Sequence, residues 1–322
     1  MPVDRNPGAA RRVPAGEVGG WHARMAAAAF VAVWELARRL PEAVVFAGAN
    51  LGGRLAWYLS PGLRAGITRN LARVVPAGDL ERCARDAFCS YARYWVESFR
   101  STDLSGDDLD RRTTTSGFEH LDRALTEGKG VIVLLAHHGS WDVAARWAED
   151  HGYHMAAVAE VIEPRRLFER FVRLRESIGL EVVPLQSGSG GSGQSSSGVS
   201  GRHRGMRLAR VLAANHLVGL LSDRDVGGSG TVVQLFGDAA ALPRGPVVLS
   251  QRTGAPIVPI TMLQRPGRRW HLQVLPPVDV SGEAIESGVQ LVAKAIEELI
   301  RLAPAQWHAF SPVFVSDKTE RS

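Results

Sequence analysis

Cysteine is scarce in this 322-residue chain, which contains only Cys83 and Cys89. Two cysteines six residues apart in one expected helix support neither a disulfide framework nor a zinc knuckle, and a reducing compartment is the simplest setting. We also expect no secretory signal here, because residues 1–20 are rich in Arg, Pro and Gly and contain no apolar core segment. We expect residues 1–20 to be a disordered tail.

Apolar runs long enough to cross a bilayer are missing as well. The most apolar early run, Met25 to Leu36, is shorter than the roughly 20 residues that a spanning helix needs, and Val44 to Leu59 is interrupted by glycines and Arg54. We expect residues 22–60 to form one or two helices with wide apolar faces. Two interpretations stay open: the helices pack on the body of the protein, or they also lie in the membrane interface.

The composition is that of a folded chain with a basic surface. Hydrophobic residues make up 45% and charged residues 22%, so a large core can form. The formal charge of +5 suits anionic partners such as phospholipid headgroups, coenzyme phosphates or nucleic acid. The basic residues are scattered and match no nucleic-acid-binding motif, so we do not expect nucleic acid as a partner.

Strands and helices alternate at short spacing from about residue 117 onward. The continuous apolar run Val131 to Ala136 is typical of a buried parallel strand, and similar runs recur down the chain. This pattern predicts an α/β fold with a mostly parallel central sheet flanked by helices. We expect a helical layer over 21–116, an α/β core over 117–315 and a tail over 316–322.

Two local features are also expected. Asp79 would cap a helix that runs through Phe99, and Trp270 to Val280 would form one long late strand.

One segment departs from this alternation. Of the fifteen residues from Ser187 to Gly201, thirteen are Ser or Gly, which predicts a flexible loop over 187–204. The segment contains a formal G-x-G-x-x-G at 188–193, but Ser and Gly continue where a dinucleotide site would begin its helix. We therefore do not expect a nucleotide site there.

The chemistry is expected around the end of the strand at 131–136. His137 would lie at the carboxyl edge of the sheet, where ligand sites in open α/β sheets gather. A tight turn through Gly139 would bring the Asp142 carboxylate back to the imidazole, fix its tautomer and leave the other nitrogen as a base. Backbone N–H groups of Gly139, Ser140 and Trp141, at the start of the next helix, would hold an oxyanion or position the substrate.

Alternatives to this interpretation involve neighbouring residues. A strand-end His and a helix-start Asp are often only structural, and His138 competes for the role of base. His137, His138 and Asp142 could supply metal ligands, and so could Asp223 and Asp225. The spacing matches no established metal site, so none is expected. The G-x-S-x-G of serine hydrolases is absent.

Short pieces of sequence support the H-x-x-x-x-D motif in a fixed order over roughly residues 70 to 310. They are Asn70–Pro76, Ser90–Arg100, Gly128–Val131, Ala159–Glu160, Phe168–Val172, Arg175–Val182, Asp223–Asp225, Phe236–Gly237, Leu242–Pro246 and Gln306–His308. The motif resembles the signature of glycerolipid and lipid A-type acyltransferases. The wider chain is similar to the phosphatidylinositol mannoside acyltransferases of actinobacteria, within the lipid A lauroyl-acyltransferase superfamily.

The resemblance implies acyl-CoA-dependent O-acylation of a membrane glycolipid, with acyl-CoA as co-substrate and no bound cofactor. It implies that His137 is the general base, that Asp142 holds it, and that the acceptor oxygen attacks the thioester without an acyl-enzyme. The enzyme would lie peripherally on the cytoplasmic face of the cell membrane, docked on anionic lipid by its N-terminal helices and by Arg38, Arg39 and Arg64. The substrate-binding positions implied or conjectured with it are Glu160, Arg175, Arg224 and Asp225.

The chain departs from the family pattern in the expected strand near 230–237. Relatives carry acidic residues there, one of which supports the catalytic His, whereas this chain has Val232 and Gln234. Either Asp142 serves alone, another carboxylate substitutes, or activity is weak. Three alternatives therefore stay open: a diverged acyltransferase acting on another glycolipid or a glycosylated natural product, an acyl-CoA thioesterase, and a non-catalytic lipid-binding protein.

Overall fold

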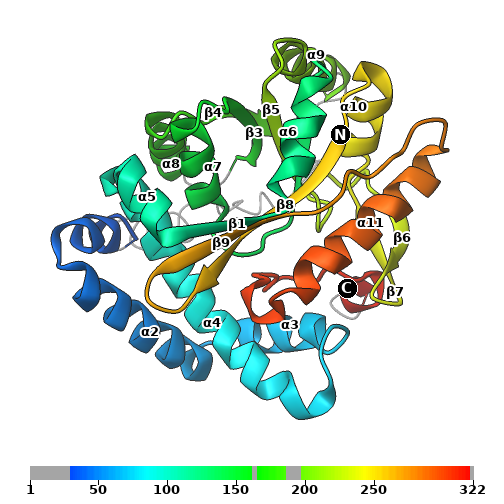
Figure 1. Cartoon of the computed structure of the whole chain (residues 1–322). Helices are drawn as coiled ribbons and strands as arrows, with labels where there is room; N and C mark the ends of the chain where they lie inside the picture. Colours follow the sequence, from blue (N-terminus) through cyan, green and yellow to red (C-terminus); the bar gives the residue numbers. More distant parts are fainter. Residues whose placement is uncertain (1–29, 162–164, 186–196, 320–322) are drawn as a thin grey trace, which may run out of the picture.

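The computed structural model describes residues 30–161, 165–185 and 197–319. The expected tail 1–20, the start of the first apolar helix, the formal G-x-G-x-x-G at 188–193 and the last three residues lie outside these ranges. Within them the expected α/β class is confirmed: a seven-stranded, mostly parallel sheet is flanked by helices (Figure 1).

The sheet has the strand order β1-β9-β8-β2-β5-β3-β4, and a separate hairpin is formed by β6 and β7. Strands β8, β2, β5, β3 and β4 are mutually parallel, whereas β9 is antiparallel to β8 and parallel to β1. The strands are β1 (Thr113–Ser116), β2 (Val131–Leu135), β3 (Met155–Glu160), β4 (Glu181–Leu185), β5 (Leu217–Leu221), β6 (Thr231–Leu235), β7 (Asp238–Leu242), β8 (Ile257–Arg265) and β9 (Arg269–Val274).

Helices cover both faces of the sheet and one of its ends. A helical stretch at residues 30–39 comes first. The later helices are α2 (Glu42–Leu59), α3 (Pro61–Leu71), α4 (Ala77–Arg100), η1 (Ser101–Asp103), α5 (Gly106–Arg112), α6 (Phe118–Thr126), α7 (Trp141–Asp150), α8 (Arg165–Ser177), α9 (Ser197–Ala213), α10 (Gly245–Thr253), α11 (Ile285–Arg301), η2 (Pro304–Gln306) and α12 (Val315–Thr319). No helix in the described ranges is long and apolar enough to span a bilayer.

Strand β2 is buried on both sides, as its unbroken apolar sequence predicts. Ile132 and Leu134 belong to a core cluster shared with α9, α10 and α11. The alternate residues Val131, Val133 and Leu135 belong to a second cluster shared with α6 and α7. The residue that follows β2 is therefore delivered from the centre of the protein to the carboxyl edge of the sheet.

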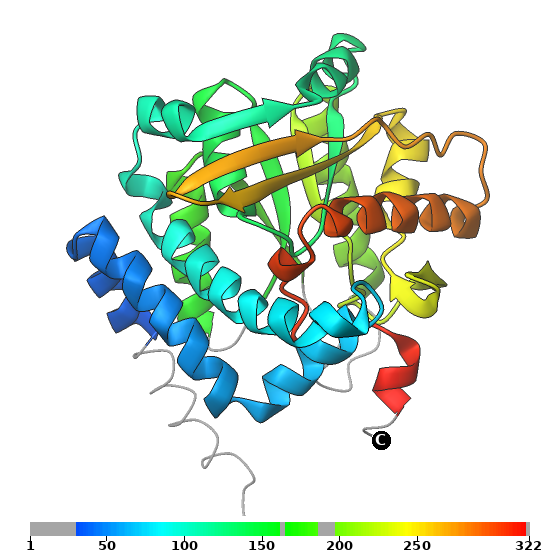
Figure 2. The same cartoon turned by 60° about the horizontal axis from the view of Figure 1, so that its bottom comes forward.

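Helix α4 connects the three core clusters. It runs beneath the sheet with α2 alongside it (Figure 2), and at 24 residues it is about 36 Å long. Its buried side chains divide among all three clusters: Ala84, Ala87 and Phe88, then Tyr94, then Val96 and Phe99. Helix α2 approaches α4 closely at Gly53, where a Cβ would lie 2.7 Å from the Cα of Cys89.

Strands β2 and β5 are adjacent and pair in register from Val131↔Leu217 to Leu135↔Leu221. The hydrogen bond from the Ser222 N–H to the Leu135 carbonyl, at 2.8 Å, continues this pairing past the last strand residue. Two residues that follow β2 and β5 by the same number of positions therefore lie side by side at the sheet edge.

Three expectations about local structure are wrong. Helix α4 begins at Ala77, so Asp79 lies in its first turn, where its charge complements the helix dipole, rather than at the N-cap. Strand β9 ends at Val274, because Pro276 and Pro277 follow and lack the N–H groups that a longer strand needs. Helix α9 begins at Ser197, so residues 197–204 are helical rather than part of a loop.

The turn that leads into β2 allows a test of this backbone. Gly130 has φ +67°, and a Cβ there would lie 2.6 Å from the His216 carbonyl oxygen and 2.7 Å from that of Leu212; Gly128 has φ +70° with open space around it. Gly128→Ala should lower the free energy of unfolding by about 1 kcal/mol, from backbone strain alone. Gly130→Ala should lower it by about 2–4 kcal/mol, because a clash is added. Urea unfolding of both variants measures the difference, and equal losses would contradict this account.

Candidate active site

His137 is the second residue after β2, and its ring is held by a carboxylate. The Nδ1 atom lies 2.6 Å from Oδ1 of Asp223, which is the second residue after β5. The His137 side chain is 27% exposed, whereas that of Asp223 is 1% exposed. The other ring nitrogen, Nε2, makes no hydrogen bond to any described residue. Asp223 therefore sets the tautomer of the ring, and the other nitrogen has no hydrogen-bond partner within the described ranges.

Asp223 is held from both sides. Its second oxygen, Oδ2, accepts a hydrogen bond of 2.9 Å from the indole N–H of Trp307, which is fully buried. Burial alone would raise the pKa of Asp223, but the charge and hydrogen bond of His137 and the Trp307 N–H outweigh it. The pKa of this carboxyl group therefore lies well below its usual range. The carboxylate is ionised beside the imidazole at neutral pH.

Asp142 does not hold His137, so this expectation from the sequence is wrong. Its Oδ2 accepts hydrogen bonds from Tyr94 and Ser98 of α4, at 2.9 and 2.8 Å, and its Oδ1 accepts one of 3.0 Å from Nε of Arg175. The physical reason is that Asp142 is only 2% exposed, and these three donors occupy its carboxylate oxygens in place of the imidazole. Asp142 thus anchors the start of α7 to α4 and α8.

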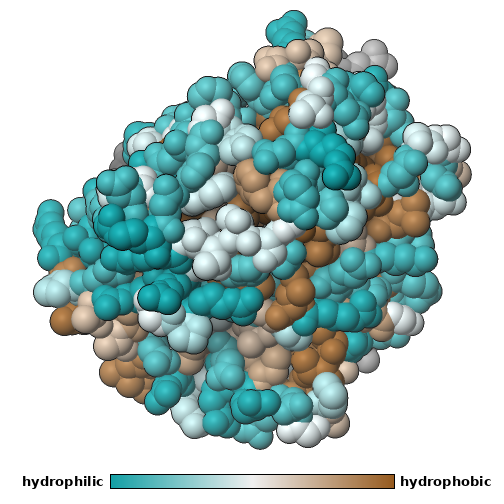
Figure 3. Space-filling model, in the orientation of Figure 1, coloured by the Kyte–Doolittle hydropathy of each residue, from teal (hydrophilic) through white to brown (hydrophobic). Residues whose placement is uncertain are grey.

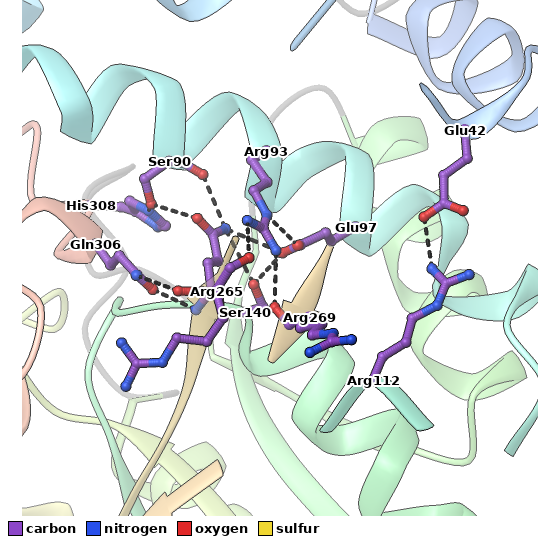
Figure 4. A network of polar contacts seen from close by, with 11 residues as sticks. Glu42, Ser90, Arg93, Glu97, Arg112, Ser140, Arg265, Arg269, Gln306 and His308 are labelled. Atoms are coloured by element: carbon purple, nitrogen blue, oxygen red, sulfur yellow. Dashed lines mark hydrogen bonds and ion pairs between the residues drawn. The ribbon is translucent and has the colours of Figure 1, made fainter. Parts of the chain in front are cut away.

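A second buried carboxylate, Glu97 of α4, holds the turn between His137 and α7. It accepts hydrogen bonds from the Ser140 hydroxyl, from Nε2 of Gln264 at 3.2 Å and from Nε of Arg93 at 2.6 Å. In Figure 4, Arg93 and Glu97 project from α4 toward Ser140 and the β8–β9 hairpin, where Arg93 also donates to the carbonyls of Arg265 and Arg269.

The backbone of the same turn is hydrogen-bonded within the protein. The Gly139 N–H donates to the Gln306 carbonyl at 3.0 Å, and the Ser140 N–H donates to the Met262 carbonyl at 2.8 Å. These two N–H groups are therefore not available to an oxyanion, and in this respect the sequence-based expectation is wrong. Gly139, with φ +66°, and Ser140 position the turn. The guanidinium of Arg175 lies over the Trp141 ring, with its Cζ atom 4.3 Å from the ring centroid.

His138 points away from His137 into the core. It is 1% exposed, with Nδ1 2.9 Å from the Thr261 hydroxyl and Nε2 2.9 Å from the Ala303 carbonyl. Burial lowers its pKa to about 4. With both nitrogens occupied, it does not compete as the base. His137, His138 and Asp142 also do not converge as a ligand set, and no metal-binding cluster of His, Cys, Asp and Glu occurs in the described part of the chain.

The four expected substrate-binding residues lie in different surroundings. Glu160, half-buried, ends β3 at the same sheet edge as His137. Arg175 forms an ion pair with Asp142, and its side chain is 13% exposed. The Asp225 carboxylate accepts hydrogen bonds from the N–H groups of Gly227 and Gly230, at 3.0 and 2.6 Å, and so holds the loop between β5 and β6.

Arg224 is the member of this set whose charge is unpaired. It makes no ion pair with the described residues, and its buried Nε has no hydrogen-bond partner among them. Burial raises the pKa of Tyr91, and the charge of Arg224 works against that rise; the same charge contributes to the lowered pKa of Asp223. Arg224 therefore lies beside the His137–Asp223 pair.

Sequence reasoning missed the roles of Asp223 and Trp307 and the polar face of α4. One signal was present: Asp223, like His137, follows a buried apolar strand at the carboxyl edge of a sheet. Trp307 was noticed only as part of the family resemblance at Gln306–His308, and nothing in the sequence indicated that its indole contacts Asp223.

Val232 and Gln234 stand where acids were expected from the resemblance. Val232 is 62% exposed, and Gln234 is exposed and bonded through its backbone to Gln290 of α11. These outward positions do not contact His137. Of the alternatives left open by the sequence, the one that fits is substitution by another carboxylate, Asp223.

A strand-end histidine is held by a buried carboxylate on an α/β fold, and its second nitrogen makes no hydrogen bond to the described residues; this is the arrangement that a general base needs. A family model described as bacterial lipid A biosynthesis acyltransferase matches residues 21–316. The chain belongs to this family and is an acyltransferase.

Curated relatives cover nearly the whole chain. A phosphatidylinositol mannoside acyltransferase of Mycolicibacterium smegmatis is 33% identical over 294 residues, which are 90% of this chain and 92% of that protein. One of Mycobacterium tuberculosis is 33% identical over 297 residues, 91% of this chain and 89% of that protein. The resemblance inferred from the sequence is confirmed.

The buried histidines should make the fold acid-sensitive. Burial lowers the pKa of His308 to about 3 and that of His138 to about 4, both below the unfolded value of about 6.5. Between about pH 6.5 and 4 these two histidines are therefore protonated in the unfolded chain but neutral in the folded chain. The free energy of unfolding should fall as the pH drops through this range. Each group contributes about 1.4 kcal/mol per pH unit.

Urea unfolding at several pH values between 5 and 6.5 measures this slope. His308→Gln should reduce the slope by about 1.4 kcal/mol per pH unit, and subtraction from wild type cancels the other titrating groups. The control, His203→Gln, changes an exposed ring on α9 and should retain the wild-type slope. A slope unchanged in His308→Gln would contradict the neutral, buried state of His308.

Proposed function

We propose that the enzyme transfers a fatty acyl group from acyl-CoA to a sugar hydroxyl of a membrane glycolipid resembling phosphatidylinositol mannoside. The observation that carries the proposal is the buried Asp223 on Nδ1 of His137, with Nε2 left free. The names of the relatives that match over most of their length support the acceptor class.

In the proposed mechanism, His137 acts as the general base and Asp223 fixes its tautomer. Nε2 takes the proton of the acceptor hydroxyl while that oxygen attacks the thioester carbonyl carbon. The C–S bond then breaks, and the CoA thiolate receives the proton from the imidazolium. The charge that develops on the ring is stabilised by the ionised Asp223, 2.6 Å away.

Direct attack without an acyl-enzyme fits the position of the nearest hydroxyl in the motif. The Ser140 hydroxyl is fully buried and donates to Glu97, on the α4 side of the turn. A serine nucleophile would instead need its oxygen within reach of the free histidine nitrogen.

Arg224 is the side chain best placed to bind an anion at this site. It makes no ion pair with the described residues, and its buried Nε lacks an acceptor among them. A phosphate of the acceptor headgroup or of the coenzyme would supply both. Glu160, at the end of β3, would contact the acceptor from the neighbouring part of the sheet edge.

We also propose that the enzyme lies peripherally on the cytoplasmic face of an anionic membrane; the exposed apolar side chains of the N-terminal helices support the peripheral position. Eight of the eleven exposed large apolar side chains in the described ranges lie between residues 30 and 63. On α2, one stripe is buried against α4 while an outer stripe is at least half exposed, and Figure 3 shows apolar surface over α2 at the lower left. The outer stripe consists of Val44, Leu51, Leu55, Tyr58 and Leu59.

Basic residues near this stripe differ in their availability. Arg38 pairs with Asp103 and Arg39 lies 3.8 Å from Glu35. Arg64 lies over the Trp57 ring, 5.5 Å from its centroid, and makes no ion pair with the described residues. Of the three, Arg64 is therefore the one free to meet a lipid phosphate.

The reaction is tested by mass spectrometry of lipids from an actinobacterial extract incubated with the enzyme and palmitoyl-CoA. Wild type should add one acyl mass to a glycolipid. His137→Ala should abolish this transfer, and Asp223→Asn should slow it by roughly 10³-fold, because the amide no longer fixes the reactive tautomer. His120→Ala, a control on α6, should retain wild-type transfer.

Other outcomes would replace this proposal. Free fatty acid as the product with every acceptor would identify a thioesterase. CoA release equal in wild type and His137→Ala would remove His137 from the mechanism. Acyl-CoA binding without product from any acceptor would favour a non-catalytic lipid-binding protein.

Membrane docking is tested by flotation with vesicles of anionic phospholipid. Replacing Leu51, Leu55 and Leu59 together by Ser should weaken vesicle binding by roughly 10- to 100-fold, because each leucine loses apolar area buried in the interface. The matched control, Val232→Ser with Leu302→Ser, removes exposed apolar side chains elsewhere and should float as wild type does. Equal flotation of the triple variant and the control would contradict docking through α2.

A further inference from the structure

We propose that Trp307 is a positioning residue for general-base catalysis, and that its indole N–H fixes the Asp223 carboxylate against His137. This inference rests on the proposed function, in which His137 is the base. It deepens that proposal by naming a third member of the catalytic arrangement that carries no charge and takes part in no proton transfer.

The side-chain geometry forms a chain of two hydrogen bonds. The Trp307 Nε1 donates to Oδ2 of Asp223 at 2.9 Å, and Oδ1 of the same carboxylate lies 2.6 Å from Nδ1 of His137. Trp307 and Asp223 are both essentially inaccessible to water. An indole N–H is a donor only and keeps that role at every pH, so it holds the carboxylate in one rotamer.

The backbone around Trp307 reinforces this arrangement. The His308 N–H donates to the His137 carbonyl at 2.8 Å, and the Gly139 N–H donates to the Gln306 carbonyl at 3.0 Å, which forms a short antiparallel bridge across His138 and Trp307. One segment, residues 306–308, therefore holds the backbone that carries the base and the carboxylate that orients it.

Residues 306–308 are themselves fixed to the body of the protein. The Gln306 amide exchanges two hydrogen bonds with the backbone of Gln264 on β8, at 2.7 and 3.0 Å. Nε2 of His308 lies 2.9 Å from the Ser90 hydroxyl on α4, and Figure 4 shows His308 next to Ser90. The indole is thus held in place independently of Asp223, as positioning requires.

Removing the indole N–H should change the proton affinity of His137. Without that donor, more of the negative charge of Asp223 remains to stabilise the imidazolium, so the pKa of His137 should rise. The other titratable groups around the pair are Arg224 and the buried His138 and His308. The two histidines stay neutral above pH 5, so their titration does not mask the change in His137.

The test compares Trp307→Phe with a matched control, Trp147→Phe. Trp147 is also a buried tryptophan whose Nε1 donates to a carboxylate, Asp110 at 3.1 Å, but it lies on α7 outside the site. Trp307→Phe should lower kcat by roughly tenfold with little change in KM, and should move the acid limb of the kcat/KM profile to higher pH. Trp147→Phe should change neither.

Two further measurements keep the outcome unambiguous. An NMR titration of labelled His137 follows its pKa in wild type and variants without any substrate, so it reports on Trp307 even if the acceptor class is wrong. Should Trp307→Phe fail to fold, benzothienylalanine at position 307 keeps the shape of the indole and replaces only its N–H. An unchanged His137 titration and pH profile in a folded Trp307 variant would overturn the proposal, while loss of transfer in His137→Ala would leave the proposed function standing.

Discussion

The in-register pairing of β2 with β5 is the constraint on which the site depends. The register joins residues 86 positions apart, such as Val131 and Leu217, and His137 and Asp223 are also 86 positions apart. Two residues past the end of each strand, the pairing that aligns two buried strands also aligns an imidazole and a carboxylate. A slip of one residue in this register would separate them, because successive side chains of a strand point to opposite faces of the sheet.

Helix α4 provides the second constraint, because its polar face holds the turn between His137 and α7. Glu97 accepts a hydrogen bond from the Ser140 hydroxyl, while Tyr94 and Ser98 donate hydrogen bonds to Asp142. Burying Glu97 and Asp142 costs desolvation energy that Arg93 and Arg175 only partly offset. These buried side chains hold the turn in a single position, as the proposed role of His137 as general base requires.

Helix α4 also connects the site around His137 to the outer surface of the protein. Its buried side packs on the sheet, while α2 packs against it from outside and turns an apolar stripe outward. The polar face of α4 beside His137 and the apolar outer stripe of α2 are thereby joined in one layer, which fits the proposed transfer to a membrane glycolipid.

The local pattern of residues determined the α/β class, the buried strand β2, the position of His137 after it, and the family. These follow from apolar periodicity and from a motif that is contiguous in sequence. Tertiary structure alone decided that β5, rather than β3, lies beside β2, so that Asp223 and not the nearby Asp142 meets the imidazole. Strand order and register are set by packing between distant segments, and such packing leaves no trace in the spacing of neighbouring residues.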